Sequence, residues 1–142
     1  MKNKFKNNKQ NPKWKGGKKA RLERLKNNLK YQLNKRIRTV IAKRLKGNKN
    51  GRKSYDLVGY NVEKLKKRLE STMPDGYTWT DFMNGKLEID HIIPISAFNF
   101  DNPENIDFRR CWALSNLQLL PMRENRIKNN KLTESFQPSL RI

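Results

Sequence analysis

The residues best able to do chemistry lie in the second half of the chain, around its sole histidine, His91. An imidazole titrates close to neutral pH, so it can take up a proton during a reaction. Asp90 directly precedes it, and Asn116 and Asn125 follow downstream. A lone histidine beside an aspartate is more often an ordinary hydrogen-bonded or surface pair. Asn116 could simply start a turn, and Asn125 is one of many asparagines in this chain. A catalytic interpretation therefore depends on the elements that carry these residues.

Two short strands are expected around the histidine. KLEIDHIIPI alternates apolar and acidic residues, which predicts a half-buried strand that reaches His91 and is ended by Pro94. SNLQLLP predicts a second strand, which begins at Asn116 and is ended by Pro121. A long loop joins the two strands, between His91 and Asn116.

Two helices complete this half of the chain. FDNPENIDFRRCW predicts a short helix with Pro103 in its first turn. A last helix, from about Met122 to Lys131, carries Asn125. The expected order is strand, loop, strand and helix.

This order of segments resembles the HNH, or ββα-metal, endonuclease family. The resemblance is carried by LEIDHIIPISAF, CWALSNLQLLP and ENRIKNNK, and DLVGYNVEKLKKRLES is similar to the segment that precedes the nuclease motif in many phage and prophage HNH proteins. It covers about residues 54–131. It implies an α+β fold in which a small ββα-metal nuclease module follows a basic helical N-terminal region.

The resemblance also implies roles for the four polar residues. His91 would activate water, and Asn116 would brace the loop through hydrogen bonds and orient His91. Asp90 and Asn125 would bind one divalent cation per site, and this hard oxygen ligand set suits Mg²⁺ or Mn²⁺. Asn125 stands where the last histidine of the motif is expected, so this chain is an H-N-N variant without the stronger Zn²⁺ or Ni²⁺ binding of a histidine ligand. Glu88 is either a second acid near the site or a solvated strand charge.

Upstream, two helices and a turn are expected. Apolar residues recur every three or four positions from about Ala20 to Lys46, which predicts one basic amphipathic helix. Such a helix could lie on a membrane or bind a partner, but packing on the protein's own core is the favoured interpretation. A second helix is predicted from Val62 to Ser71 with Asn61 as N-cap, and a short one, with Thr80 as its cap, ends at Gly85. Pro74-Asp75-Gly76 predicts a turn.

The positive charge is concentrated at the N-terminal end. Residues 1–55 contain 21 Lys and Arg and one acid, Glu23, whereas residues 56–142 are neutral, so the whole net charge of +20 lies in the first part. Such a block normally contacts a polyanion, although a solvated tail or an anionic membrane are alternatives. We expect a disordered basic arm over 1–18, a helix and linker over 19–53, the nuclease module over 54–132 and a C-terminal tail over 133–142.

Candidate nucleic-acid contacts occur in the arm and the helices. Trp14 could stack on a base or dock on the protein's own core. Arg109 and Arg110 are about as consistent with a surface role as with phosphate contact. The candidates are basic or aromatic side chains: Lys13, Trp14, Lys15, Lys18, Arg36, Arg123, Arg126 and Lys128.

Two classes of function remain open on the sequence. One is a metal-dependent HNH endonuclease or nickase acting on DNA, and the other is a non-catalytic basic nucleic-acid-binding protein. No apolar run approaches the ~18 residues of a transmembrane helix, and the single cysteine, Cys111, excludes an internal disulfide or a multi-cysteine zinc site. We expect a monomer in the cytoplasm, in a bacterial host cell if the gene is phage-borne, with DNA as partner and no membrane contact.

Overall fold

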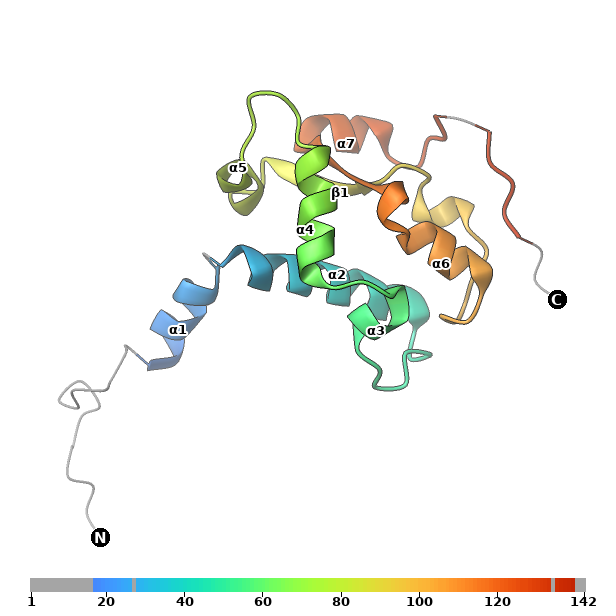
Figure 1. Ribbon diagram of the computed structural model, residues 1–142, viewed down its shortest axis with the longest axis horizontal. Coiled ribbons are helices and arrows are strands. Elements are labelled where there is room, and N and C mark those ends of the chain that lie inside the picture. Colours follow the sequence, from blue (N-terminus) through green and yellow to red (C-terminus); the bar gives the residue numbers. More distant parts are fainter. Residues whose placement is uncertain (1–16, 27, 134, 140–142) are drawn as a thin grey trace, which may run out of the picture.

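The computed structural model describes residues 17–26, 28–133 and 135–139. Helices surround a two-stranded antiparallel sheet, which confirms the α+β class (Figure 1). The elements run in the order α1 (Gly17–Lys26), α2 (Leu29–Leu45), α3 (Ser54–Val58), α4 (Val62–Ser71), α5 (Trp79–Met83), β1 (Leu87–His91), η2 (Ile95–Ala97), α6 (Ile106–Trp112), η3 (Leu114–Asn116), β2 (Leu117–Pro121) and α7 (Met122–Lys128).

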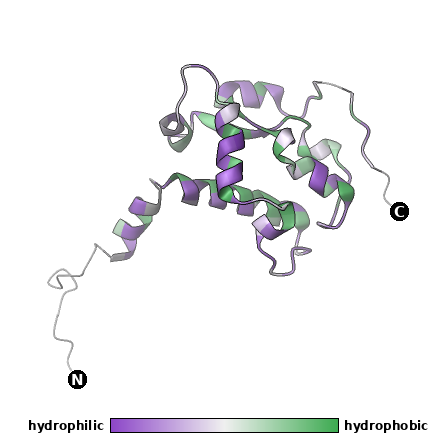
Figure 2. Cartoon of the chain, viewed as in Figure 1, coloured by the Kyte–Doolittle hydropathy of each residue, from purple (hydrophilic) through white to green (hydrophobic). Residues whose placement is uncertain are grey.

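The sheet separates an apolar side from a polar side. β1 and β2 pair with Leu87 opposite Pro121, Asp90 opposite Gln118, and His91 opposite Leu117. Because side chains alternate between the faces of a strand, Leu87 points into the core while Glu88 and Asp90 point toward α7. Both α4 and α7 present mainly hydrophilic residues on the visible surface (Figure 2).

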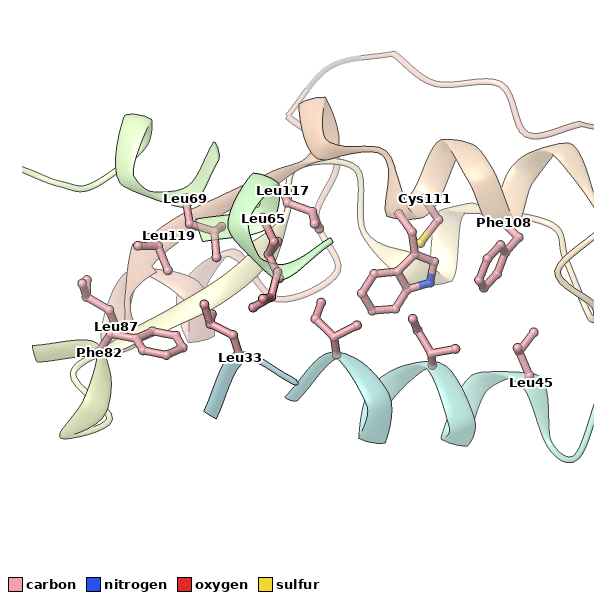
Figure 3. Packing of buried hydrophobic residues seen from close by; sticks show 14 residues of the cluster. Leu33, Leu45, Leu65, Leu69, Phe82, Leu87, Phe108, Cys111, Leu117 and Leu119 are labelled. Carbon is pink, nitrogen blue, oxygen red and sulfur yellow. The ribbon is translucent and has the colours of Figure 1, made fainter. Parts of the chain in front are cut away.

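The core is built on the apolar stripe of α2. Leu33, Ile37, Ile41 and Leu45 are all buried, and they pack against α4, α6 and the sheet. Figure 3 shows Leu33 pointing toward Leu65 and Phe82, and Leu45 pointing toward Phe108. The prediction that this helix packs on the protein's own core is therefore confirmed for α2.

The prediction of a single helix from Ala20 to Lys46 is wrong in one respect, because this segment forms two helices, α1 and α2. Asn28 has an extended backbone, and its Oδ1 accepts a hydrogen bond of 3.1 Å from the backbone N–H of Tyr31, so it caps a new helix. Leu22 on α1 is 44% exposed and does not join the core. The side chain of Leu25, predicted to share the stripe, lies outside the described part of the chain.

Of the elements between α2 and the sheet, one matches its prediction fully. α4 runs from Val62 to Ser71, and the side chain of Asn61 accepts the backbone N–H of Lys64 at 2.9 Å. The Pro74 turn is confirmed by a hydrogen bond from Tyr77 N–H to the Pro74 carbonyl. The short helix α5 is capped by Thr78 and not Thr80, because the backbone N–H of Thr78 donates to Asp81. The helix α3 was not predicted.

The elements around the histidine are shorter than predicted. β1 ends at His91, before Pro94. Asn116 closes the η3 turn, so β2 begins one residue later. The last helix ends at Lys128 because Asn129 has a positive φ of 46°, outside the helical range.

Pro103 lies before the helix α6, not in its first turn as predicted. The side-chain oxygen of Asn102 accepts the backbone N–H groups of Glu104 and Asn105, at 3.0 and 3.2 Å. These bonds stabilise a turn around the proline, so the helix starts only at Ile106.

The C-terminal segment packs on the loop between the strands. The carboxylate of Asp107, fully buried on α6, accepts the backbone N–H of Asn99 at 2.8 Å and that of Ser139 at 3.0 Å. Arg110 stacks on Phe136 and pairs with Asp107 at 3.0 Å. The segment 135–139 was predicted only as a tail, but these contacts hold it against α6.

Candidate active site

Asp90 is held by donors from two neighbouring elements. Its carboxylate is 6% exposed, on the face of β1 that α7 covers. Oδ2 accepts a hydrogen bond of 2.9 Å from Gln118, the residue directly opposite on β2. Oδ1 accepts one of 3.1 Å from Nζ of Lys128. The charge of Asp90 is thus balanced inside the protein by one cation.

His91 lies in different surroundings, at the last position of β1. Its ring meets the ring of Trp112 edge to face, with the centroids 4.5 Å apart. Burial, together with the positive charges of Lys128 and Arg44, lowers the pKa of His91 to about 4. The imidazole is therefore neutral at pH 7. Its Nε2 is buried and has no hydrogen-bond partner among the described residues.

Asn116 ties the start of the loop to the start of β2. Its Oδ1 accepts the backbone N–H of Ile93 at 2.8 Å, and its Nδ2 donates to the carbonyls of Ile93 and Cys111 at 3.1 and 2.9 Å. Its own carbonyl accepts the N–H of Ile92 at 2.8 Å. Three of these four bonds hold Ile92 and Ile93, the two residues after His91. The orienting of His91 itself stays a prediction.

Asn125 is half-buried on α7, which packs on both strands. It precedes Lys128 by three residues, so the two side chains lie on neighbouring positions of one helix face. Since Lys128 reaches Asp90, this face of α7 is the one nearest the carboxylate. The role of Asn125 as a metal ligand stays a prediction.

A metal ion bound at Asp90 would have few carboxylate ligands. In the described ranges, no group of three or more His, Cys, Asp or Glu side chains could hold a metal ion. The donors predicted from the sequence are the Asp90 carboxylate and the amide oxygen of Asn125, and water or phosphate oxygens would complete the shell. These hard ligands fit Mg²⁺ or Mn²⁺, and the ammonium of Lys128 already makes the Oδ1 position one that a cation occupies.

A cavity of about 530 Å³ opens beside β1, between α2 and α7, and His91 lines it. Its lining includes the cations Lys35, Arg36 and Arg126. Three buried polar atoms of lining residues lack a hydrogen-bond partner in the described chain: His91 Nε2, Trp112 Nε1 and Glu88 Oε1. Unpaired buried polar atoms favour water or a polar ligand in such a space.

Glu88 belongs to this cavity and carries an ion pair. Its Oε1 lies 3.8 Å from Nε of Arg126, and its side chain is 35% exposed. Arg36, on the opposite wall, stacks on Phe82 with its guanidinium carbon 4.0 Å from the ring centroid. Burial lowers the pKa of Arg36, and the negative charge of Glu88 opposes that shift.

The predicted nucleic-acid contacts fall into three groups. Lys13, Trp14 and Lys15 lie outside the described residues. Lys18, Arg123 and Arg126 are exposed, whereas Arg36 is half-buried. Lys128 is only 12% exposed and is held by Asp90 and by the His91 carbonyl at 2.8 Å.

Sequence reasoning missed Trp112 and Gln118 at the site, and it assigned Lys128 to phosphate contact instead of to Asp90. Trp112 and Gln118 gave no signal, since contact with His91 or Asp90 depends on the strand register and on the packing of α6. The pairing of Lys128 with Asp90 had a partial signal, because Lys128 follows Asn125 by one helical turn.

Comparison with known proteins gives little that bears on function. No family model and no solved structure match the chain. Over 104 residues it is 29% identical to an uncharacterized protein of Acanthamoeba polyphaga mimivirus, in an alignment that covers 73% of this chain and 44% of that protein. The chain therefore spans less than half the length of this relative. Among the described helices, none is long and apolar enough to cross a membrane.

Proposed function

We propose that this chain is a metal-dependent endonuclease of the HNH type, which hydrolyses phosphodiester bonds of DNA with His91 as general base. One observation carries the proposal: the unit of β1, loop, β2 and α7 buries Asp90 against α7 and lets His91 line the adjacent cavity, while Asn116 fixes the loop between the strands. This arrangement supports the roles that the sequence resemblance implies for these residues.

Each of these residues has its own role in the proposed reaction. The neutral imidazole of His91 takes a proton from the attacking water, whose oxygen forms the new bond to phosphorus as the bond to the 3′-oxygen breaks. Asp90 and Asn125 would hold Mg²⁺ or Mn²⁺, which supplies positive charge for the phosphorane and the leaving oxygen. Asn116 keeps the end of β1 in place during the reaction.

Binding of the polyanion rests on the basic residues around this unit. Arg123 and Arg126 are exposed on α7, and Lys35 and Arg36 line the cavity wall formed by α2. Such side chains position a nucleic acid through its phosphates without reading its bases. The net charge of +20 strengthens attraction to any nucleic acid.

A non-catalytic nucleic-acid-binding protein is the second candidate. The observation that favours it is that both oxygens of Asp90 already have partners within the protein, Lys128 and Gln118. In that case the ion pair would be structural, and the cavity beside His91 would take no part in chemistry.

A plasmid assay separates the two candidates. Supercoiled DNA is incubated with the full chain and Mg²⁺ or Mn²⁺, with EDTA, and with the variants Asp90→Asn and Asn125→Ala. The endonuclease cuts only with metal and loses cutting in both variants, whereas the control Asn130→Ala, at an exposed position after α7, keeps it. Cutting that persists in EDTA would refute the metal assignment, and DNA binding without cutting under all conditions would establish the second candidate.

A further inference from the structure

The ammonium of Lys128 lies beside the Asp90 carboxylate, at the position where the proposed metal ion would bind. Its side chain is only 12% exposed, and Nζ contacts two oxygens, Asp90 Oδ1 at 3.1 Å and the His91 carbonyl at 2.8 Å. The other cation of α7 that faces β1, Arg126, is 71% exposed and sits 3.8 Å from Glu88. Lys128 is thus the cation of α7 whose charge lies inside the unit formed by β1, β2 and α7.

This placement conflicts with a divalent cation on the same oxygen. Two positive charges within about 4 Å repel each other by several kcal/mol in a partly buried setting, so they do not share Oδ1. Lysine has a flexible four-carbon stem and a compact charge, so its ammonium can move outward without unfolding the helix. Gln118 keeps its hydrogen bond to Oδ2 in either state.

We propose that Lys128 is an internal counter-cation that closes the Asp90 site until a divalent ion displaces it. The inference rests on the proposed function, because it takes Asp90 as a metal ligand. Displacement turns the ammonium out of the site toward the surface that carries Arg123 and Arg126, where it can contact a phosphate. Metal affinity is therefore low in the free protein, since only molecules with Lys128 released can bind the ion.

The test measures metal binding in the absence of DNA. The full chain is titrated with Mn²⁺, and the free ion is followed by its electron paramagnetic resonance signal. Lys128→Met removes the charge and keeps the apolar stem, and we expect it to bind Mn²⁺ at least about tenfold more tightly than the wild type. Lys131→Met, which removes an exposed charge just after α7, should change the affinity by less than about twofold. Asp90→Asn should abolish the site.

Thermal unfolding of the same proteins supplies a second readout. Without metal, Lys128→Met should unfold at a lower temperature than the wild type, since Asp90 keeps a buried charge without its cation. Mn²⁺ should raise the unfolding temperature of this variant by more than that of the wild type. If the methionine variant does not fold alone, Lys128→Gln, which keeps a donor for Oδ1, takes its place.

The outcomes separate this inference from the proposed function. Equal or weaker Mn²⁺ binding by Lys128→Met or Lys128→Gln, with a site that still depends on Asp90, overturns the counter-cation inference and leaves the metal-dependent function standing. No Asp90-dependent Mn²⁺ binding in any variant overturns both.

Discussion

Asp90 and His91 are adjacent in sequence but have opposite environments. The strand turns the carboxylate toward hydrogen-bond donors and a cation, and it turns the imidazole toward the ring of Trp112. Burial then favours the neutral form of the imidazole, while the carboxylate accepts hydrogen bonds from Gln118 and Lys128. In the proposed mechanism the imidazole is the base and the carboxylate is the anionic ligand of the metal.

Replacing His91 tests the base directly. In His91→Ala we expect the rate of plasmid cleavage to fall by about 10²–10⁴-fold, as is typical when a general base is lost. Binding of DNA, measured by fluorescence anisotropy without metal, should stay close to that of the wild type, because the buried ring contributes little to phosphate contacts. Full cleavage activity in this variant would exclude His91 as the base.

Asn116 should matter for stability as well as for activity. The change Asn116→Ala leaves the N–H and carbonyl of Ile93 and the carbonyl of Cys111 without their partner. An unsatisfied buried group costs about 1–3 kcal/mol, so the free energy of unfolding should fall by at least about 2 kcal/mol. Urea denaturation measures this decrease, and the exposed Asn130→Ala serves as the matched control. A midpoint equal to that of the control would show that the loop does not depend on these bonds.

The loop between the strands is stabilised from outside by the C-terminal segment. Asp107 connects α6 to Asn99 in the loop and to Ser139 in the segment 135–139. Burial alone would raise the pKa of Asp107, but the hydrogen bonds from Asn99, Ser139 and Arg110 outweigh it, so the pKa lies below the usual value. The long loop therefore has a second anchor besides Asn116.

Breaking this anchor should release the segment without unfolding the sheet. In Asp107→Ala we expect faster hydrogen exchange at the amides of Asn99 and Ser139, since both lose their acceptor. Asp75→Ala, in an exposed turn, is the control. Because the pKa is depressed on folding, the Asp107 contribution is complete above about pH 4 and is lost as the pH falls through the lowered value. Unchanged exchange at both amides would contradict this anchor.

The net positive charge and the candidate active-site residues are concentrated in different parts of the chain. Residues 1–55 carry the full net charge of +20, and residues 56–142 contain the candidate site with no net charge. Within the first part, α1 projects from the body and α2 packs on the core (Figure 1). The two parts meet at the cavity beside His91, where Lys35 and Arg36 of α2 lie opposite Arg126 of α7.

Deleting residues 1–18, which include seven lysines, should weaken DNA binding to a similar degree for all sequences. The slope of log K against log salt concentration should also become shallower, by about 0.9 for each phosphate that the deleted lysines neutralise in the full chain. Anisotropy titrations at several salt concentrations measure both quantities. Affinity and slope equal to those of the full chain would show that these residues do not bind DNA.

A protein with one site per chain should cut one strand at a time. One set of Asp90, His91 and Asn125 attacks one phosphate, and the second strand of a duplex runs in the opposite direction. We expect a monomer that converts supercoiled plasmid first to the open-circular form, with linear product only late and at high protein concentration. Linear product from the start, together with a dimer mass in light scattering, would contradict the monomeric nickase.

Local patterns in the sequence determined much of this protein. The alternation in LEIDH places β1 up to His91, and the cap at Asn61 with its apolar spacing gives the full extent of α4. The identity of the candidate residues also came from the sequence, since one histidine allows few choices. These features depend on contacts between residues a few positions apart, so the sequence is sufficient to predict them.

Only the tertiary structure decided how those residues are surrounded. Three contacts join residues that are 21 to 38 positions apart in the sequence: Trp112 with His91, Lys128 with Asp90, and Asp107 with Ser139. Such contacts follow from the strand register and from the packing of α6 and α7, which no local pattern encodes. The division into α1 and α2 has a local cause in the Asn28 cap, but only the tertiary structure decided that α2 packs on the core.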